Sequence, residues 1–170
     1  GGKGLCAREG VEPDLMLGML GKAFGAAGGF VAGSALAVRV IENRARSYIF
    51  STAPSPSLAA AALVATDLVE SADEPRQRLF AHARVLREGL ARLGYRVLPG
   101  EAPILPVIIG DAAETMRVSA SLLEHGVFVH GIRPPTVAPG TSRLRVTPMA
   151  THSQAQIAQA LQAFAAVRRA

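Results

Sequence analysis

Apolar residues recur with helical spacing in the middle of the chain. Steps of four and three residues separate the members of one series, which consists of Leu79, Ala83, Leu86, Leu90 and Leu93. This spacing places the side chains on one face of a helix, and Gly94, which follows the series, is typical of a helix end. We therefore predict a helix that ends at Gly94 and buries Leu79, Leu86 and Leu90.

The first seventy residues contain short apolar runs bounded by glycines and prolines. Ser34 precedes an apolar segment and is a favoured N-cap. Pro54 and Pro56 interrupt the backbone after residues 48–52, which are aromatic and β-branched. The pattern predicts buried strands at residues 13–18 and 28–33 and helices at residues 35–46 and 57–70.

A polar stretch at residues 71–75 separates two patterns. It holds two acids and a proline, and domain boundaries often fall in such stretches. Beyond the central helix we predict strands at residues 95–98, 104–109, 127–132 and 144–147 and helices at residues 112–124 and 154–167. Two residue pairs have the spacing of capping boxes, Asp111 with Glu114 and Ser153 with Gln156. The expected fold class is α/β, with one domain over residues 1–70 and a small α+β domain over residues 71–170.

Composition and charge narrow the classes of function. The formal net charge is +5, but the arginines are scattered singly, 5% of the residues are aromatic and tryptophan is absent. We therefore expect no nucleic-acid partner, whereas small anionic substrates fit the charge. The longest apolar stretch, residues 58–69, includes Thr66 and Asp67 and is too short to span a bilayer. No membrane partner is expected.

The single cysteine, Cys6, excludes an intrachain disulfide and a cysteine-based metal site. We expect a cytoplasmic setting and no metal. The chain opens with Gly1 instead of methionine and has no charged-then-apolar leader. We therefore expect no signal peptide, and we expect the chain to be a piece of a longer protein.

One lysine stands in a setting suited to covalent chemistry. Residues 21–25 read Gly-Lys-Ala-Phe-Gly and lie between the two predicted strands. Glycines there would let a planar group approach the backbone closely. A lysine must be neutral to form a Schiff base, and an apolar site favours the neutral amine. From the residues alone, a solvated loop lysine is the alternative interpretation of Lys22.

Three segments in order resemble one family of enzymes. The first is residues 13–34, with Leu-Gly-Lys-Ala-Phe-Gly at its centre, and the second is Tyr-Ile-Phe-Ser-Thr at residues 48–52. The third joins Ile-Arg-Pro-Pro-Thr-Val at residues 132–137 to Gly-Thr-Ser-Arg-Leu-Arg at residues 140–145. Together they resemble the α-oxoamine synthases, which are pyridoxal-phosphate (PLP) enzymes of fold type I. The resemblance implies the carboxyl-terminal part of such a transferase, with residues 1–70 as the tail of its large cofactor domain.

The resemblance assigns roles to five residues. Lys22 would bind PLP as a Schiff base and move protons at the amino-acid α-carbon. Thr52 would reach the cofactor phosphate of the neighbouring subunit, which implies a homodimer. Arg145 would hold the amino-acid carboxylate, a task that suits a guanidinium fork, and Arg133 and Thr136 would line the acyl-substrate entrance. Without the resemblance, the alternative interpretation of Arg145 is a solvated arginine on a strand. The turn beside Arg133 would then be an ordinary loop.

The similarity of residues 132–145 to one branch of the family implies the substrates. In that branch an acyltransferase condenses L-alanine with a pimeloyl thioester, carried by coenzyme A or a carrier protein, and CO2 is lost. Glycine C-acetyltransferase, 5-aminolevulinate synthase and serine palmitoyltransferase are the nearest alternatives, and residues 143–148 have some similarity to the second of these. A further alternative is a non-catalytic fragment that acts only in association.

The chain departs from the family at Lys3, where the resemblance implies an arginine, and in two ways that bear on the cofactor. The family usually has a threonine three residues before the lysine, where its hydroxyl meets the cofactor phosphate, and this chain has Met19. The group that stacks on the PLP ring, the aspartate at the ring nitrogen and the glycine-rich phosphate turn lie upstream of the lysine segment in the family. None of these can be carried onto this chain. Because PLP needs a partner at its ring nitrogen to accept electrons, we expect the chain alone to be a poor catalyst.

Overall fold

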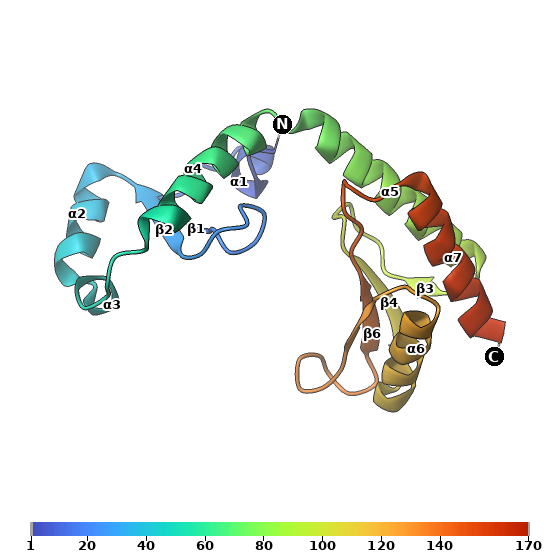
Figure 1. Cartoon of the computed structure of the whole chain (residues 1–170). Helices are drawn as coiled ribbons and strands as arrows, with labels where there is room; N and C mark the ends of the chain where they lie inside the picture. The colour runs from blue at the N-terminus through green and yellow to red at the C-terminus, as the bar shows by residue number, and fades with distance from the viewer. Residues whose placement is uncertain (1, 170) are drawn as a thin grey trace. The chain divides into compact units, whose positions relative to one another are not determined.

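The chain forms two compact units (Figure 1). The structure, a computed structural model, describes residues 2–169. Unit 1 spans residues 1–73 and unit 2 spans residues 74–170. The boundary lies inside the polar stretch at residues 71–75. That residues 1–70 form the tail of a cofactor domain stays a prediction.

The described residues of unit 1 form one hairpin and four helices. Its elements are α1 (Leu5–Glu9), β1 (Leu15–Met19), β2 (Gly29–Gly33), α2 (Ala35–Arg44), α3 (Arg46–Ile49) and α4 (Pro56–Glu70). The two strands pair antiparallel, with Leu17 opposite Val31. The hydroxyl of Ser34 accepts a hydrogen bond from the Ala37 N–H at 3.3 Å and so caps α2. Both strands and both longer helices of this unit agree with the sequence-based prediction.

The prediction that these two strands are buried is wrong for this chain. Among the described residues of unit 1 none is buried. Among the strands that the structure describes, β1 and β2 hydrogen-bond only to each other, so neither has a neighbour on its outer edge. Leu17 keeps 75% of its surface exposed and Met19 keeps 58%. The apolar composition of these strands therefore does not produce a core within unit 1.

Unit 2, as far as residue 169, is a four-stranded antiparallel sheet with three helices. Its elements are α5 (Asp73–Arg92), β3 (Arg96–Val97), β4 (Leu105–Gly110), α6 (Ala112–Glu124), β5 (His130–Ile132), β6 (Ser142–Val146) and α7 (Gln154–Arg169). The strand order is β3-β4-β6-β5. This element order agrees with the prediction. The polar stretch is shorter than expected, because α5 already begins at Asp73 and accommodates Pro75 in its first turn, where proline costs no hydrogen bond.

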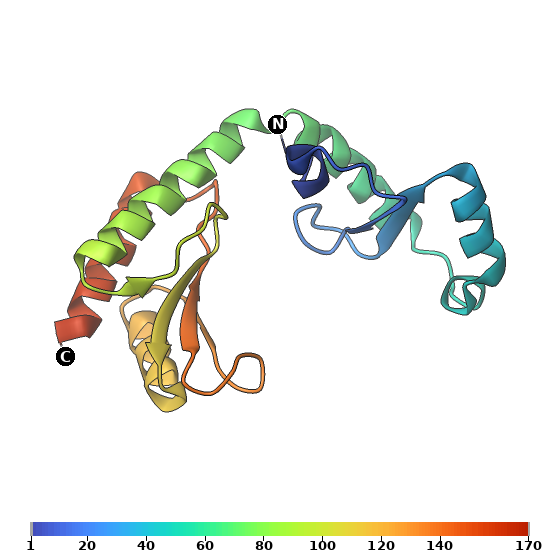
Figure 2. The ribbon, with the colours of Figure 1, turned by 180° about the vertical axis from the view of Figure 1, so that it is seen from behind.

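The three helices cover one face of this sheet (Figure 2). The core joins side chains from all three helices to alternate strand positions, and its fully buried apolar members are Leu90, Leu105, Val107, Leu122, Leu144 and Phe164. Leu86 is 2% exposed and Leu90 is 0% exposed, as predicted. Leu79 is only half-buried, because it lies toward the amino-terminal end of α5, away from the core cluster. The prediction of its burial is therefore wrong.

The two capping pairs differ in the structure. Ser153 and Gln156 form the full reciprocal box, with backbone to side-chain distances of 2.8 and 3.2 Å. Asp111 accepts the Glu114 N–H at 2.8 Å, but the Glu114 carboxylate turns to Arg117 instead. The hydrogen bond from Arg117 lowers the pKa of the Glu114 carboxyl. In the part of the chain that the structure describes, no helix has the length and apolar character needed to cross a membrane.

Candidate functional site

Lys22 lies at the tip of the β1–β2 hairpin in unit 1. The Leu20 N–H donates to the Gly28 carbonyl at 3.0 Å, and the Gly25 N–H donates to the Lys22 carbonyl at 3.0 Å. These bonds fold the tip through the backbone alone and leave the side chain outside the turn. The Lys22 side chain is exposed. Within residues 2–169 its amine has no hydrogen-bond or ion-pair partner.

The glycines around Lys22 serve two different purposes. A Cβ at Gly18 would come within 2.2 Å of the Phe30 ring, and a Cβ at Gly29 would come within 2.8 Å of the Gly18 carbonyl oxygen. Those glycines are therefore required by the packing of the hairpin itself. Gly25, in contrast, has a φ of +59° and nothing within 4 Å of a Cβ position. The backbone next to Lys22 is thus open at Gly25, and the approach of a planar group there stays a prediction.

Thr52 lies in the connection between α3 and α4 of unit 1. Its carbonyl accepts the Ser51 hydroxyl at 3.2 Å. Thr52 is exposed. Among the described residues, its side-chain hydroxyl makes no hydrogen bond. A free threonine hydroxyl can donate to a phosphate oxygen. This chemistry fits the predicted role without testing it.

Arg145 stands on the side of the unit 2 sheet that faces away from the helices. Leu144 and Val146, its neighbours along β6, point into the core, so Arg145 points outward by the alternation of a strand. It lies opposite Pro106 of β4 and His130 of β5. Its side chain is exposed. No acidic partner is found for it within residues 2–169.

A second row of the same sheet face runs parallel to the first. Arg143 lies opposite Ile108 of β4 and Ile132 of β5, and Ile108 lies opposite Arg96 of β3. We call the polar members of this outward side the basic face, which consists of Arg96, His130, Arg143 and Arg145. The strand positions on this side include no Asp or Glu. The face therefore offers cations to an anionic ligand.

The loop at residues 133–141 joins β5 to β6 and projects from the end of the sheet (Figure 2). The Thr136 N–H donates to the Arg133 carbonyl at 3.1 Å, and the Thr141 hydroxyl donates to the Ala138 carbonyl at 2.7 Å. Both Arg133 and Thr136 are exposed. Arg143 is anchored to this loop, because its Nε donates to the Thr141 carbonyl at 2.9 Å.

The predicted site residues therefore fall into two sets. Arg133, Thr136 and Arg145 belong to one sheet and its loop in unit 2, whereas Lys22 and Thr52 belong to unit 1. Their functional roles stay predictions. Sequence reasoning missed the other members of the basic face. The Arg-Leu-Arg pattern at residues 143–145 could have predicted Arg143, because residues two apart in a strand lie on the same side of the sheet.

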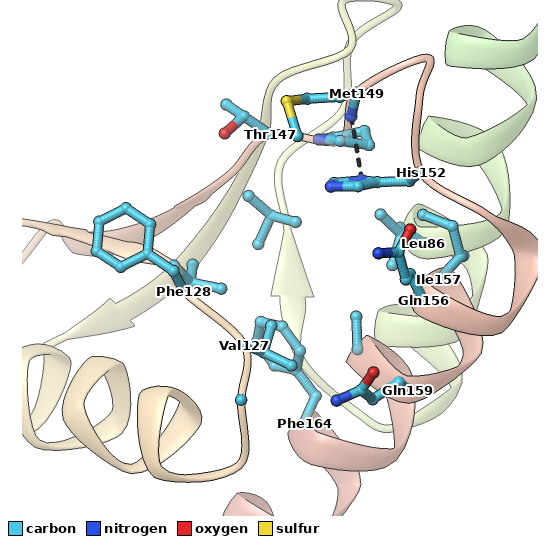
Figure 3. Close-up of a pocket in the computed structure, with 15 residues that line it drawn as sticks. Leu86, Val127, Phe128, Thr147, Met149, His152, Gln156, Ile157, Gln159 and Phe164 are labelled. Atoms are coloured by element: carbon cyan, nitrogen blue, oxygen red, sulfur yellow. Dashed lines mark hydrogen bonds between the residues drawn. The ribbon is translucent and has the colours of Figure 1, made fainter.

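Unit 2 also holds a cavity of ≈ 380 Å³ on the helix side of the sheet (Figure 3). Its lining is mostly apolar and includes Leu86, Val129 and Phe164. His152 Nδ1 accepts the Met149 N–H at 3.2 Å at its rim. No predicted site residue lines it. Among the described residues, no group of three or more His, Cys, Asp or Glu side chains is arranged to hold a metal ion.

Comparison with known proteins identifies relatives over almost the whole chain. The sequence model of the family described as aminotransferase class I and II matches residues 4–164. An 8-amino-7-oxononanoate synthase from Geobacter metallireducens is 45% identical over 170 residues, which cover 98% of this chain and 44% of the relative.

Solved structures match as well. A serine palmitoyltransferase from S. paucimobilis with PLP and myriocin bound is 31% identical, with a TM-score of 0.91 over 98% of this chain and 43% of that one. An 8-amino-7-oxononanoate synthase from Francisella tularensis is 26% identical, with a TM-score of 0.78 over 91% of this chain and 45% of that one. The chain spans less than half the length of the curated relatives that it matches. These matches confirm the expected α/β fold class.

Proposed function

The chain belongs to the aminotransferase class I and II family, and from this membership we propose that it is the lysine-bearing part of a PLP-dependent acyltransferase. The proposed reaction condenses L-alanine with a pimeloyl thioester and releases CO2, giving 8-amino-7-oxononanoate for biotin synthesis. One observation carries this proposal. The chain is 45% identical to an 8-amino-7-oxononanoate synthase over 98% of its length, and it is homologous to the carboxyl-terminal part of such enzymes.

The residues of unit 1 fit one side of PLP. The cofactor, when bound, would supply an aldehyde for a lysine amine and a ring that draws electrons from the amino-acid α-carbon. Lys22 presents an exposed amine next to the open backbone at Gly25. Thr52 offers an exposed hydroxyl for a phosphate oxygen. Met19 has only a thioether, which cannot donate a hydrogen bond, so the contact usual at that position is missing.

The polar groups of this chain would then divide the work. The Lys22 amine would take up and return the proton at the α-carbon of the amino acid. The Arg145 guanidinium would pair with the amino-acid carboxylate through two parallel hydrogen bonds and so orient the amino acid. Arg133 and Thr136 would contact the acyl substrate from the β5–β6 loop. We further propose a homodimer, because the resemblance assigns Thr52 to the cofactor phosphate of the neighbouring subunit.

A sister reaction is the second candidate. The match to the serine palmitoyltransferase from S. paucimobilis has a TM-score of 0.91, against 0.78 for the synthase from Francisella tularensis. Backbone similarity alone therefore favours an enzyme that uses another amino acid and another acyl chain. Sequence identity favours the first candidate, with 45% for the synthase from Geobacter metallireducens against 31% for the palmitoyltransferase.

The lysine assignment has a direct test with an internal control. Lys3 and Lys22 are the only lysines of the sequence. We expect PLP followed by borohydride reduction to label Lys22 in preference to Lys3, because in the proposed homodimer the Thr52 hydroxyl of the neighbouring subunit would contact the phosphate of a cofactor at Lys22. Peptide mapping by mass spectrometry measures the ratio. Lys22→Arg should remove most of the label and Lys3→Arg should leave it, whereas equal labelling of both lysines would contradict the proposed cofactor site.

A further inference from the structure

The basic face of unit 2 has more cationic groups than one amino-acid carboxylate requires. Arg145 and His130 lie in one cross-strand row, and Arg143 and Arg96 lie in the next. The resemblance assigns a ligand to Arg145 alone in these rows. Arg143 is half-buried in contrast to the exposed Arg145. Within the described residues it has no acidic partner.

The hydrogen bonding of Arg143 leaves one particular set of donors free. Its Nε donates to the Thr141 carbonyl at 2.9 Å, which fixes the guanidinium against the β5–β6 loop. The two terminal nitrogens, Nη1 and Nη2, then remain for a ligand. A pair of parallel N–H groups matches the two oxygens of a carboxylate. The side chain is thus preorganised for a carboxylate.

The position of Arg143 fits the far end of an extended acyl chain. Arg143 and Arg145 are two residues apart on one side of β6, so their Cα atoms are about 7 Å apart. Arg143 is the nearer of the two to the loop that carries Arg133 and Thr136. An acyl chain that runs from the amino acid at Arg145 toward this loop therefore passes Arg143. When the acyl carbon is joined to the amino-acid α-carbon, eight carbon–carbon bonds of about 1.5 Å separate the amino-acid carboxyl carbon from the far carboxyl carbon, about 10 Å in an extended chain. This exceeds the Cα separation by about 3 Å, which the long side chain of the exposed Arg145 can cover.

We propose that Arg143 binds the free carboxylate of a dicarboxylic acyl substrate while Arg145 holds the amino-acid carboxylate. This inference rests on the proposed function and adds the residue that distinguishes a dicarboxylic acyl chain from a monocarboxylic one. The discrimination has a physical basis. A chain that ends in a methyl group would leave the half-buried guanidinium of Arg143 without an anion, and burial makes an unpaired charge costly.

Binding of free acids to the whole chain tests this inference without PLP. The probes are pimelate, which has a carboxylate at both ends, and heptanoate, which has the same chain length and one carboxylate. We expect ¹⁵N-labelled chain to bind pimelate about tenfold more tightly than heptanoate, because the diacid uses both arginines. The amide signals of residues 143–145 should shift. Arg143→Gln should reduce the affinity for pimelate to that for heptanoate.

Two further variants separate binding from folding and from general charge. Arg143→Lys keeps the charge but not the paired donors, so it should retain only part of the preference. Arg92→Gln removes an exposed arginine from α5 and should leave the preference unchanged. The spectra report for each variant whether the fold is kept.

The possible results judge the inference and the proposed function separately. A pimelate preference that survives in Arg143→Gln would overturn the role of Arg143 and leave the proposed reaction standing. No preference in the unmodified chain would also overturn the inference, while the labelling of Lys22 would still decide the cofactor assignment. The third outcome concerns competition with inorganic phosphate. If phosphate displaces pimelate at a lower concentration than heptanoate does, the basic face binds phosphate and the inference is overturned.

Discussion

Tyr95 joins the last helix of unit 2 to its sheet. Its hydroxyl donates to the Phe164 carbonyl at 2.9 Å, and its ring meets the Phe164 ring edge to face at 5.3 Å. The Arg168 guanidinium lies 4.9 Å from the centre of the tyrosine ring. Burial raises the pKa of the Tyr95 phenol above its usual value of 10.0, and Arg168 opposes part of that shift.

The raised pKa of Tyr95 makes the stability of unit 2 depend on alkaline pH. The folded state holds the phenol proton more tightly than the unfolded state does, so the contribution is complete below pH 10.0 and is lost as the pH rises through the higher folded pKa. Tyr95→Phe should cost about 1 kcal/mol at neutral pH, from the lost hydrogen bond, and should flatten the alkaline fall. Thermal melts between neutral and alkaline pH measure this, with the exposed Tyr48→Phe as control. If the melting temperatures of Tyr95→Phe and of the unmodified chain fall in parallel at alkaline pH, the role of the Tyr95 pKa is contradicted.

The site residues show how far single positions could be predicted. Lys22 and Arg145 were selected as candidates through the motifs around them, since a lysine between glycines and an arginine in a strand are each ordinary on their own. Arg143 was missed, although its two-residue step from Arg145 was visible in the sequence. Its value as a candidate depends on Thr141, whose carbonyl engages one nitrogen of the guanidinium. Such a contact depends on the path of the loop, which local sequence does not specify.

The apolar face of helix α5 is more deeply buried toward its carboxyl-terminal end than toward its amino-terminal end. Leu90 is fully buried against the sheet, whereas Leu79 is half-buried, although the same helical spacing selects both. Leu90→Ala should cost about 3 kcal/mol, because truncation of a buried leucine adds a cavity to the lost transfer energy. Leu79→Ala should cost distinctly less. Urea denaturation of unit 2 measures both values, and equal losses would show that α5 is packed evenly along its length.

Elements with clear local signals were predicted well, and the short helix α3 was not predicted. α6 was predicted with its observed ends, because Asp111 caps it within three residues. Residues 48–52 are β-like in composition, yet the chain forms α3 there and a turn after it, with the Phe50 N–H bonded to the Arg46 carbonyl at 3.0 Å. A strand needs a partner strand, whereas a helical turn closes its own hydrogen bonds. β1 and β2 pair with each other, but no buried layer packs on them among the described residues of unit 1, so their faces stay exposed.

The two units differ in how much core they contain. Unit 2 has the buried residues of the described chain, whereas unit 1 leaves apolar side chains in solvent, such as Leu63 of α4 at 70% exposure. Burial of apolar surface is what opposes local opening. Hydrogen exchange should therefore find protected amides in β4 and β6 and nearly unprotected amides in β1, β2 and α4. Mass spectrometry of exchanged peptides measures this, and a dilution series reveals whether association adds protection. Equal protection of both units at the lowest concentration would contradict the expectation.

The place of β6 in the sheet has a consequence for the order in which unit 2 can assemble during synthesis. β6 is the last strand along the chain, yet it lies between β4 and β5. β5 leaves the ribosome before it and pairs only with β6 among the described strands. The emerging chain can form the β3–β4 ribbon early, but β5 has no edge to join until residues 142–146 follow. The sheet is completed from its middle, and the basic face appears only then, because Arg143 and Arg145 arrive with the strand that completes it.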